Sequence, residues 1–312
     1  MATLTVSKGI LGYCCELTDN AMEWSNSMLD KAIVPAAGLG TRLLPATKEQ
    51  PKEMLPIFSP GGKNQSQLKP LLQMIFEQLY DLGLHQFCFI IGRGKRAIED
   101  HFTQDYEFTS TLRSRNKLSS IRDLEGFYKR LDDSTIVWLN QPEPRGFGEA
   151  VLRGRRFIGQ DEFLTHAGDT YVISEGGQHI HRLIEAHSRL DSEATFLVEE
   201  MEDPRKYGVI KGEPVDRGVY EVKRIEEKPE RPPSKLAVVP IYAFTPRIFE
   251  ELAGTKPGKG GEIQLTDAIQ SLVAHHRKVY AVQLKKSELK IDIGNPETYW
   301  QALKTSYERT LK

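Results

Sequence analysis

From residue 31 onward, short apolar runs alternate along the chain with segments whose apolar residues recur at helical spacing. In Leu71–Leu82, for example, apolar positions 71, 72, 75, 76, 79 and 82 form one stripe of a helix. Strands alternating with helices of this length are typical of βα units around a mainly parallel sheet. The expected strands are Ala32–Ala36, Gln86–Ile91, Thr135–Leu139, Phe163–Ala167, Ala194–Val198 and Val279–Leu284. The other expected helices are Lys95–Phe102, Gly148–Phe157, Gln178–Leu190, Pro246–Ala253, Leu265–His275 and Pro296–Tyr307.

Two regions depart from this alternation. Phe108–Arg130 is polar with scattered apolar residues, and we expect a helical excursion there rather than a central crossover. Three later segments read as strands joined by short turns, which indicates a more antiparallel region; they are Tyr207–Ile210, Val219–Ile225 and Leu236–Phe244. The Pro- and Gly-rich stretch Ser59–Gly62 is expected to be a loop. The chain is therefore predicted to be an α/β protein with a mixed, mainly parallel sheet flanked by helices.

The N-terminal residues 1–29 show little periodicity and precede the first strand. We expect them to be an accessory tail on a single domain of residues 30–312. A translation start at Met28 and an ordered N-terminal decoration are the two alternatives. Mass spectrometry of the native N-terminus distinguishes them.

Composition and charge narrow the possible partners. The chain is 39% hydrophobic and 27% charged, as in globular proteins, and its net charge of −1 provides no bulk attraction to nucleic acid or to an anionic membrane. No apolar run reaches the roughly 18–20 residues of a membrane span. Cys14, Cys15 and Cys88 have no C-x-x-C spacing, so we expect neither a disulfide framework nor structural zinc, and a cytoplasmic location. The pairs His179/His181 and His275/His276 lack a further ligand at metal spacing and are expected on helix surfaces.

The strongest chemical signal directly follows the first strand. The run Ile33–Arg42 ends in small residues, Gly38, Gly40 and an arginine, and Lys52 follows shortly after. Glycines permit close approach of a ligand and positive φ, and successive backbone N–H groups form an anion-binding concavity. The dinucleotide fingerprint would need a third glycine, but position 43 is leucine, and the Gly-Lys-Ser/Thr of a P-loop is absent. The pattern indicates a polyphosphate site of another kind.

The string from Ala36 through Lys48 and on to Pro56 resembles the signature of the sugar-1-phosphate nucleotidyltransferases, in particular the bacterial and archaeal UTP–glucose-1-phosphate uridylyltransferases. The resemblance extends over about residues 30–308 and implies a Rossmann-like nucleotidyltransferase fold with its antiparallel region near a sugar site. It implies that Arg42 and Lys52 are catalytic, neutralising charge on the reacting phosphates. The nucleotide-binding residues implied in this loop are Ala36, Ala37, Gly38, Gly40 and Thr41.

A second constellation, Asn140–Val151, follows the strand Thr135–Leu139. Gln141 offers both donors and an acceptor, which suits a pyrimidine edge, and Gly146 would let the base lie against the backbone. The resembling family has Gln…Gly-Leu-Gly-x-Ala here, which is close to this sequence. An ordinary βα loop would explain the glycines but not the glutamine at the strand end.

Two aspartates are candidate metal ligands. Asp169 follows a buried strand, where a parallel sheet places its ligand crevice, and Mg²⁺ prefers carboxylate oxygens together with substrate phosphates. The resemblance implies that Asp169 binds the metal, although this chain has Asp-Thr where some members have Asp-Asp. Asp292 is a weaker second ligand, by resemblance to the related thymidylyltransferases. Each could instead be a turn aspartate, and Asp169 could also be a helix N-cap.

A fourth group of residues is assigned to the sugar. The resemblance implies that Gly208 lies close to the sugar ring, that Glu227 accepts hydrogen bonds from its hydroxyls and that Lys228 pairs with its phosphate and is catalytic. A charged turn before Pro229 is the alternative. The stretch 260–269 is expected at the base of this pocket, with Thr266 or Asp267 as possible helix caps.

The implied reaction is uridylyl transfer from UTP to α-D-glucose 1-phosphate, assisted by Mg²⁺, in an oligomer that uses Phe108–Arg130 as a candidate contact. The departures are an insertion at Ser59–Gln67 and Val239–Ile241, where the family commonly has Val-Gly-Arg. The second departure lies near the expected sugar pocket and concerns the choice of sugar. The alternative enzymes are a thymidylyltransferase or another sugar-1-phosphate nucleotidyltransferase. A non-catalytic regulatory protein that binds nucleotide sugars is the alternative from another class.

Overall fold

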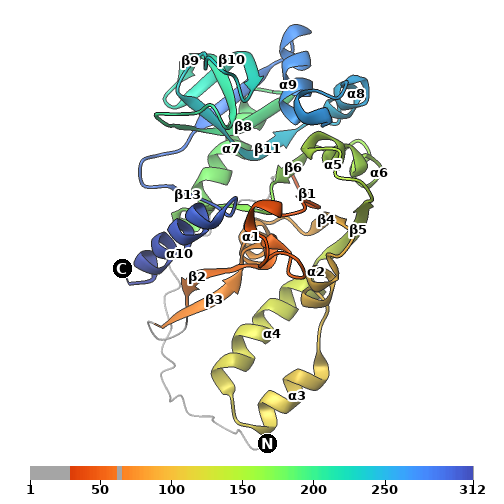
Figure 1. Cartoon of the computed structure of the whole chain (residues 1–312), viewed down its shortest axis with the longest axis vertical. Helices are drawn as coiled ribbons and strands as arrows, with labels where there is room; N and C mark the ends of the chain where they lie inside the picture. Colours follow the sequence, from red (N-terminus) through yellow and green to blue (C-terminus); the bar gives the residue numbers. More distant parts are fainter. Residues whose placement is uncertain (1–28, 62–64, 312) are drawn as a thin grey trace, which may run out of the picture.

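The computed structural model of the chain describes residues 29–61 and 65–311. Within them, the fold is built on one nine-stranded sheet with the strand order β5-β4-β1-β6-β11-β8-β12-β10-β9 (Figure 1). In that order the strands are β5 (Thr135–Gln141), β4 (Gln86–Gly92), β1 (Lys31–Ala36), β6 (Phe163–His166), β11 (Leu236–Phe244), β8 (Ala194–Glu200), β12 (Val279–Gln283), β10 (Val219–Glu227) and β9 (Gly208–Asp216). The predicted accessory tail lies outside the described residues, apart from Leu29, which is buried in the core.

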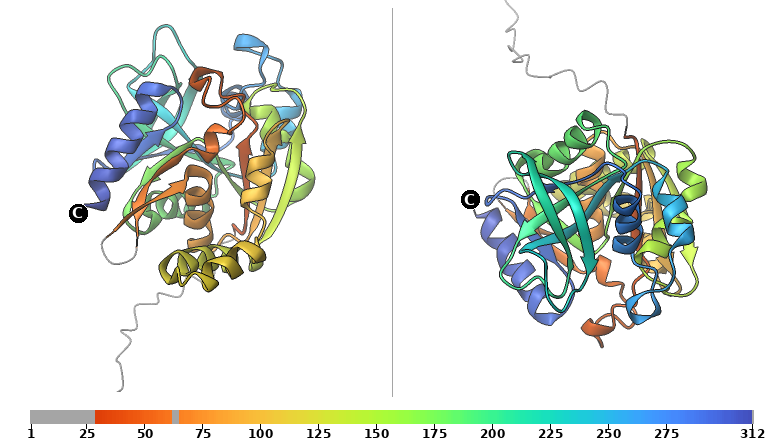
Figure 2. Two further views of the ribbon diagram at one scale, coloured as in Figure 1. Left: turned by 60° about the horizontal axis from the view of Figure 1, so that its bottom comes forward. Right: turned by 90° about the horizontal axis from the view of Figure 1, so that it is seen from above.

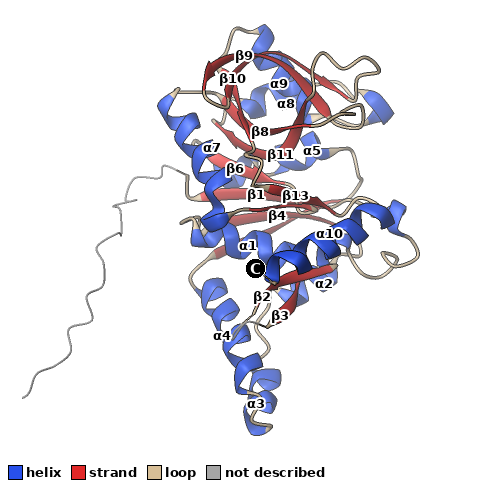
Figure 3. Cartoon of the chain, turned by 90° about the vertical axis from the view of Figure 1, so that its left-hand side faces the viewer, coloured by secondary structure: helices blue, strands red, loops and turns tan. Residues whose placement is uncertain are grey.

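The sheet has two halves of different character. β5, β4, β1 and β6 are all parallel to one another, and we call them the parallel half. The remaining five strands form the mixed half, in which β11 is antiparallel to β6 and β8, β12 is parallel to β8, and β10 is antiparallel to β12 and β9. The predicted mixed α/β sheet is confirmed. Its antiparallel region is continuous with the parallel half, and it is not a separate unit (Figure 3).

Helices cover both faces of this sheet (Figure 2). Because successive side chains of a strand point to opposite faces, Ala32 and Val34 enter one core while Ile33 enters the other. The first core receives α1 (Leu71–Asp81), α2 (Arg96–His101), α4 (Leu118–Asp132), α7 (Gln178–Arg189) and α10 (Pro296–Thr310). The second receives α5 (Phe147–Arg153), α6 (Arg155–Ile158), α8 (Ile248–Gly254) and α9 (Leu265–Ala274).

Four short strands were not predicted. β2 (Pro56–Pro60) and β3 (Ser66–Pro70) form an antiparallel hairpin, so the expected loop at Ser59–Gly62 is wrong for Ser59 and Pro60. β7 (Thr170–Ile173) pairs with β13 (Leu289–Asp292) far along the chain. These strands are four or five residues long, which is too short for a clear period of two. Only their pairing partners stabilise them as strands.

One predicted helix is divided in two. The expected helix Gly148–Phe157 is wrong as a single element, because α5 ends at Arg153 and α6 begins at Arg155. Between them, Gly154 packs against the core so closely that a Cβ atom there would lie 2.3 Å from Cδ1 of Ile33. Close packing on β1 therefore sets this boundary.

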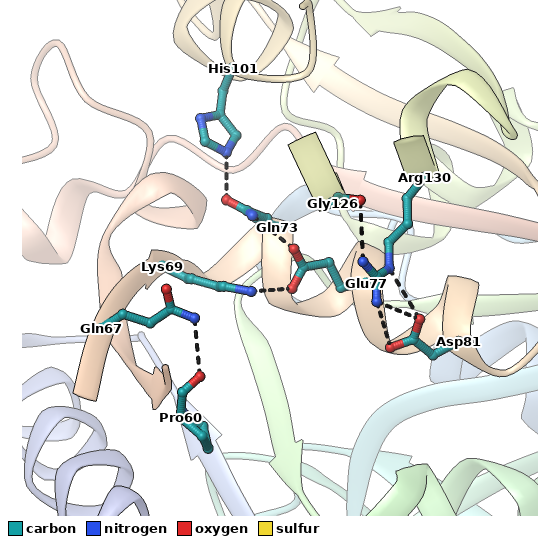
Figure 4. A network of polar contacts seen from close by, with 9 residues as sticks. All are labelled: Pro60, Gln67, Lys69, Gln73, Glu77, Asp81, His101, Gly126 and Arg130. Carbon is teal, nitrogen blue, oxygen red and sulfur yellow. Dashed lines mark hydrogen bonds and ion pairs between the residues drawn. The ribbon is translucent and has the colours of Figure 1, made fainter. Parts of the chain in front are cut away.

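The predicted helical excursion is confirmed as α3 (Tyr106–Ser114) and α4, which project from the sheet in Figure 1. A polar network at its base joins the β2–β3 hairpin and α2 to α1 (Figure 4). His101 Nε2 lies 2.9 Å from Gln73 Oε1, Gln73 Nε2 donates to Glu77 Oε1 at 2.9 Å, and Lys69 Nζ donates to Glu77 Oε2 at 2.7 Å. The network fixes α1 between these two peripheral units.

The prediction of a helix-surface position is wrong for His179, whereas His181 on the same helix is partly exposed. His179 is fully buried on the inner side of α7, where its Nδ1 lies 2.6 Å from Ser174 Oγ, and burial lowers its pKa to about 3. His275 and His276 are exposed as expected. Across the described ranges, no three histidine, cysteine or acidic residues gather as a metal site, and no helix is long and apolar enough to cross a membrane.

Candidate active site

The loop after β1 has the geometry that its glycines indicate. Gly40 has a φ of 65°, and its carbonyl accepts a hydrogen bond from Thr47 Oγ1 at 2.7 Å. Thr41 and Arg42 follow in a short 3₁₀ turn. A Cβ atom at Gly38 would lie 3.6 Å from Nζ of Lys52, which is ordinary van der Waals contact, so the ammonium group lies directly beside the loop. The loop therefore presents backbone beside a buried cation.

That cation contacts an acid from another strand. A 3₁₀ turn at Lys52–Met54 directs the Lys52 ammonium group to Asp169 Oδ2, just past the end of β6. Burial opposes the charge on Lys52, but attraction from Asp169 and Glu53 outweighs it and raises the lysine pKa. Burial likewise opposes ionisation of Asp169, yet Lys52 holds the pKa of that carboxyl below its ordinary value. Both groups are charged at neutral pH.

The second candidate metal ligand is brought to this pair by the two strands that were not predicted. In the β7–β13 ladder Asp292 pairs with Thr170, the residue after Asp169, and Ile293 N donates to Asp169 O at 3.0 Å. Burial and the neighbouring Asp169 charge raise the pKa of Asp292 to about 6, against the opposing effect of nearby cations. The two carboxylates are therefore neighbours in space.

This donor set fits a hard divalent cation. Asp169 and Asp292 offer oxygen ligands, and Mg²⁺ is usually held by one or two carboxylates with substrate phosphates and water completing its shell. Burial and the neighbouring charge of Asp169 together raise the pKa of Asp292, and a bound cation would relieve the repulsion between the two carboxylates. The residues present therefore fit a metal that arrives with a phosphate substrate.

A cavity of about 380 Å³ gathers most of the predicted nucleotide residues. The predicted residues that line it are Ala37, Gly38, Gly40, Thr41, Arg42, Lys52, Gln141, Gly146 and Asp169. Ala36 is buried and does not line the cavity. Asp292 does not line it either, but Gly294, two residues further along the chain, does. Loops that follow β1, β5 and β6 thus meet around one space.

On the far wall of this cavity, Gln141 ends β5 and is 5% exposed. Its Nε2 donates to Glu149 Oε2 at 2.5 Å and to Gly146 O at 3.2 Å. Gly146 has a φ of 106°, and a Cβ there would lie 2.7 Å from Ile263 O. Contact with the backbone at 263, as well as φ, therefore requires glycine at this position.

The predicted sugar residues lie outside this cavity and contact one another. Gly208 pairs with Glu227 across β9 and β10, and Lys228 Nζ lies 2.9 Å from Glu227 Oε1. Thr266 Oγ1 donates to Glu227 Oε2 at 3.0 Å, so the reading of Thr266 or Asp267 as a helix cap is wrong; Gln264 precedes the helix. A second hollow of about 500 Å³ contains Glu227 in its wall.

One buried ion pair was missed from the sequence. Glu53 is 1% exposed and lines the cavity, and its Oε2 lies 2.7 Å from Nζ of Lys95. Burial raises the pKa of Glu53 despite the attraction of Lys95 and Lys52. The available signal was an acid between a candidate catalytic lysine and the apolar Met54 and Leu55. Nothing in the sequence pointed to Lys95, because it lies after β4, far along the chain from Glu53.

The chain is similar to known proteins over most of its length. A family model described as "Nucleotidyl transferase" matches residues 31–309. The chain belongs to this family. It is similar to a putative UTP–glucose-1-phosphate uridylyltransferase of Methanocaldococcus jannaschii, with 40% identity over 79% of this chain and 83% of that protein. It is also similar to the UTP–glucose-1-phosphate uridylyltransferase of Pseudomonas aeruginosa, with 36% identity over 91% of this chain and 98% of that protein.

Solved structures of this nucleotidyltransferase family share the fold. A UDP-glucose pyrophosphorylase complexed with UDP-glucose has a TM-score of 0.76 and 34% identity, covering 90% of this chain and 99% of that chain. A UTP-bound UGPase from Acinetobacter baumannii has a TM-score of 0.77 and 28% identity, covering 89% of this chain and 93% of that chain. The likeness therefore extends over about nine-tenths of this chain.

Proposed function

We propose that this nucleotidyltransferase transfers the uridylyl group of UTP to α-D-glucose 1-phosphate, giving UDP-glucose and pyrophosphate. The observation that carries the proposal is the meeting of Arg42, Lys52, Asp169 and Gln141 around one cavity. Two cations, a carboxylate that could bind a metal and an amide that could meet a base thus share one cavity, as the proposed reaction requires. The names of the similar proteins support the same reaction.

The chemistry is a single displacement at phosphorus. A phosphate oxygen of glucose 1-phosphate attacks the α-phosphorus of UTP, the bond to the bridging oxygen of the β-phosphate breaks, and pyrophosphate leaves with that electron pair. The attacking oxygen is already ionised, so no general base and no covalent enzyme intermediate are required. Positioning and charge neutralisation are the tasks left to the protein.

The residues divide these tasks. Backbone N–H groups around Gly38 and Gly40 bind the triphosphate, and Arg42 and Lys52 neutralise charge on the reacting phosphates and on pyrophosphate. Because Asp169 keeps Lys52 protonated, the lysine acts as a fixed cation and not as a proton donor. Asp169 and Asp292 would hold Mg²⁺, and Asp292 is ionised for this role above its pKa of about 6. When bound, the metal adds positive charge at the phosphates.

The sugar is assigned to the mixed half. Glu227 accepts hydrogen bonds from sugar hydroxyls beside Gly208, and Lys228 pairs with the sugar phosphate and assists catalysis. Thr266 holds the Glu227 carboxylate in place through its hydroxyl. This half would therefore determine which sugar phosphate reacts.

The decisive experiment is a matrix of pyrophosphate release. UTP, dTTP, CTP and ATP are each assayed against glucose, galactose and mannose 1-phosphates in Mg²⁺. We expect the highest kcat/KM for UTP with glucose 1-phosphate. A strong preference for dTTP, or no turnover of glucose 1-phosphate, rejects the substrate assignment, and tight binding of UDP-glucose without turnover favours a regulatory protein.

The proposed assembly is a homo-oligomer, a dimer or tetramer, in the cytoplasm. The projecting α3–α4 excursion exposes Tyr106 and Phe108, and this surface is the proposed contact. The single described cysteine, Cys88, is buried and free, which suits a reducing compartment. Light scattering on the purified full chain measures the assembly directly, and a monomeric mass contradicts the proposal.

A further inference from the structure

A chain of polar contacts lies behind the base-reading glutamine. Arg153 Nη1 donates to Asn140 O at 3.1 Å, and its Nη2 lies 2.6 Å from Glu149 Oε1. The other oxygen of Glu149 accepts from Gln141 Nε2, which also donates to Gly146 O. The Glu149 side chain is 12% exposed, so little water competes for these contacts. Each oxygen of the Glu149 carboxylate thus has its own donor.

These contacts determine which way the Gln141 amide points. Both neighbours of its Nε2 are acceptors, a carboxylate oxygen and a backbone carbonyl. The reversed amide would place Gln141 Oε1 against these two oxygens and lose both hydrogen bonds. An ionised carboxylate has no proton to donate, so Glu149 cannot adapt to the reversed orientation.

The remaining polar atom of Gln141 is its Oε1. Within the described part of the chain it has no hydrogen-bond partner, and it is not among the buried polar atoms that lack one. It therefore keeps accessible surface, and Gln141 lines the cavity. The side chain presents an acceptor, and not its NH₂ group, to a ligand there.

We propose that Glu149 is a positioning residue for base selection: by fixing the Gln141 amide, it makes the site select a pyrimidine with a hydrogen on N3. This inference rests on the proposed function, in which Gln141 meets the base. Uracil and thymine carry N3–H and can donate to Oε1. Cytosine has an unprotonated N3 acceptor at that position, which would face another acceptor and be disfavoured.

A purely structural role for Glu149 gives a different expectation. Glu149 and Arg153 lie one turn apart on α5, and such a pair can simply stabilise the helix end. Its loss would then lower activity with every nucleotide by the same factor. Base selection instead predicts a change in the ratio between nucleotides, which separates the two roles.

The sharpest test is Glu149→Gln, because it preserves size and removes only the charge. Arg153 can only donate, so it binds the single oxygen of the new amide. The new NH₂ group then faces Gln141 and favours the reversed orientation of the Gln141 amide, in which Oε1 accepts from it. We expect the ratio of kcat/KM for UTP to that for CTP to fall about tenfold or more, which is the discrimination that one matched hydrogen-bonding edge of a base typically provides. The UTP to dTTP ratio should stay unchanged, because both bases carry N3–H.

A double-mutant cycle tests whether the effect passes through Gln141. In a Gln141→Ala background, Glu149→Gln should leave the UTP to CTP ratio where Gln141→Ala alone places it. Glu149→Ala, which frees the amide without reversing it, should lower the ratio less than Glu149→Gln. Glu185→Gln, on the exposed side of α7, is the control and should behave as wild type.

Two results would overturn the inference. One is a Glu149→Gln enzyme with the wild-type UTP to CTP ratio, and the other is an equal loss for all three nucleotides. Either can occur while the wild-type protein still forms UDP-glucose from UTP. Failure of the wild-type protein to use UTP would instead reject the proposed function itself.

Discussion

The parallel and mixed halves of the sheet build their parts of the site in different ways. In the parallel half, all strands run in one direction, so the loops that follow them open on one edge. Those loops carry Gly38 and Arg42 after β1, Gln141 at the end of β5 and Asp169 after β6. Gln141 and Asp169 therefore lie at or just after the end of a strand, and Gly38 and Arg42 lie in the loop that follows β1.

In the mixed half, all neighbouring strands except β8 and β12 run in opposite directions, so their loops are divided between two edges. The site residues there meet through cross-strand pairing and helix packing instead. Gly208 begins β9 and faces Glu227 at the end of β10, while Thr266 reaches the same carboxylate from α9. The difference teaches that strand direction decides whether a site is built from strand-end loops or from facing pairs.

The comparison also separates two functions. In the proposed roles, the parallel half holds the charged groups that act on the UTP phosphates, and the mixed half holds Glu227 for the sugar hydroxyls and Lys228 for the sugar phosphate. Substitutions in the first should lower the rate of the chemical step, and substitutions in the second should weaken use of the sugar phosphate. The following predictions test this division from the largest expected effect to the smallest.

The largest effect is expected for Lys52→Ala in the parallel half. It removes the cation beneath the glycine loop and leaves Asp169 without its partner. We expect kcat to fall by about 10²–10³, the loss typical of a single electrostatic group at a reacting centre. Steady-state pyrophosphate release measures it. Lys48→Ala is the matched control, because that side chain is 76% exposed and lies outside the cavity; near-normal turnover of Lys52→Ala would refute the assignment.

Next is Glu227→Gln in the mixed half. Losing a charged acceptor for sugar hydroxyls should lower kcat/KM for glucose 1-phosphate by roughly 10–100-fold, the value of a charge-assisted hydrogen bond. The KM for UTP should remain unchanged. Glu221→Gln on the same strand is the control, since its partner Lys223 lies on the surface. An equal rise in both KM values would break the division between the halves.

The third prediction concerns the helix that covers the mixed half. α7 packs on β8, β11 and β12, and the folded-state pKa of its buried His179 is about 3, well below the roughly 6.5 of an unfolded histidine. As pH falls below 6.5 the unfolded chain takes up a proton that the folded chain refuses, so stability is lost. Between pH 7.5 and 5 this amounts to about 2 kcal/mol.

Thermal unfolding at the two pH values measures this loss. His179→Asn keeps a polar atom near Ser174 and should show a smaller fall in Tm on acidification than the wild type. His276→Asn, at an exposed position, is the control, and its Tm should fall on acidification by as much as that of the wild type. An identical fall for His179→Asn and wild type would contradict the role of this buried ring.

The smallest effect is expected for Thr266→Val, which removes one hydroxyl and keeps the side-chain shape. Glu227 loses the hydrogen bond that fixes its carboxylate. Glu227 keeps its charge and its contact with Lys228, so only part of the roughly 1.5–3 kcal/mol of a hydrogen bond to a charged group is lost, and kcat/KM for glucose 1-phosphate should fall about two- to tenfold. Ser at this position should restore the wild-type value. A fall in kcat/KM for UTP alone would place Thr266 with the nucleotide instead.

The sequence by itself determined the alternation of strands and helices, the glycine loop and the order of the motifs. It could do so because long apolar periods and glycines at strand ends are local features of the chain. The helices around the sheet and the excursion at α3–α4 could be predicted from the sequence for the same reason. His179 was misjudged, because its neighbours in sequence do not reveal which side of α7 the sheet covers.

Only the tertiary structure decided which of these groups meet. β7 and β13 are too short to predict, yet their pairing brings Asp292 beside Asp169. Glu149 has an ordinary helical spacing to Arg153, and its role emerges only from the contact with Gln141. Local patterns encode the elements, but burial and charge act over distances in space, and those distances exist only once the chain has folded.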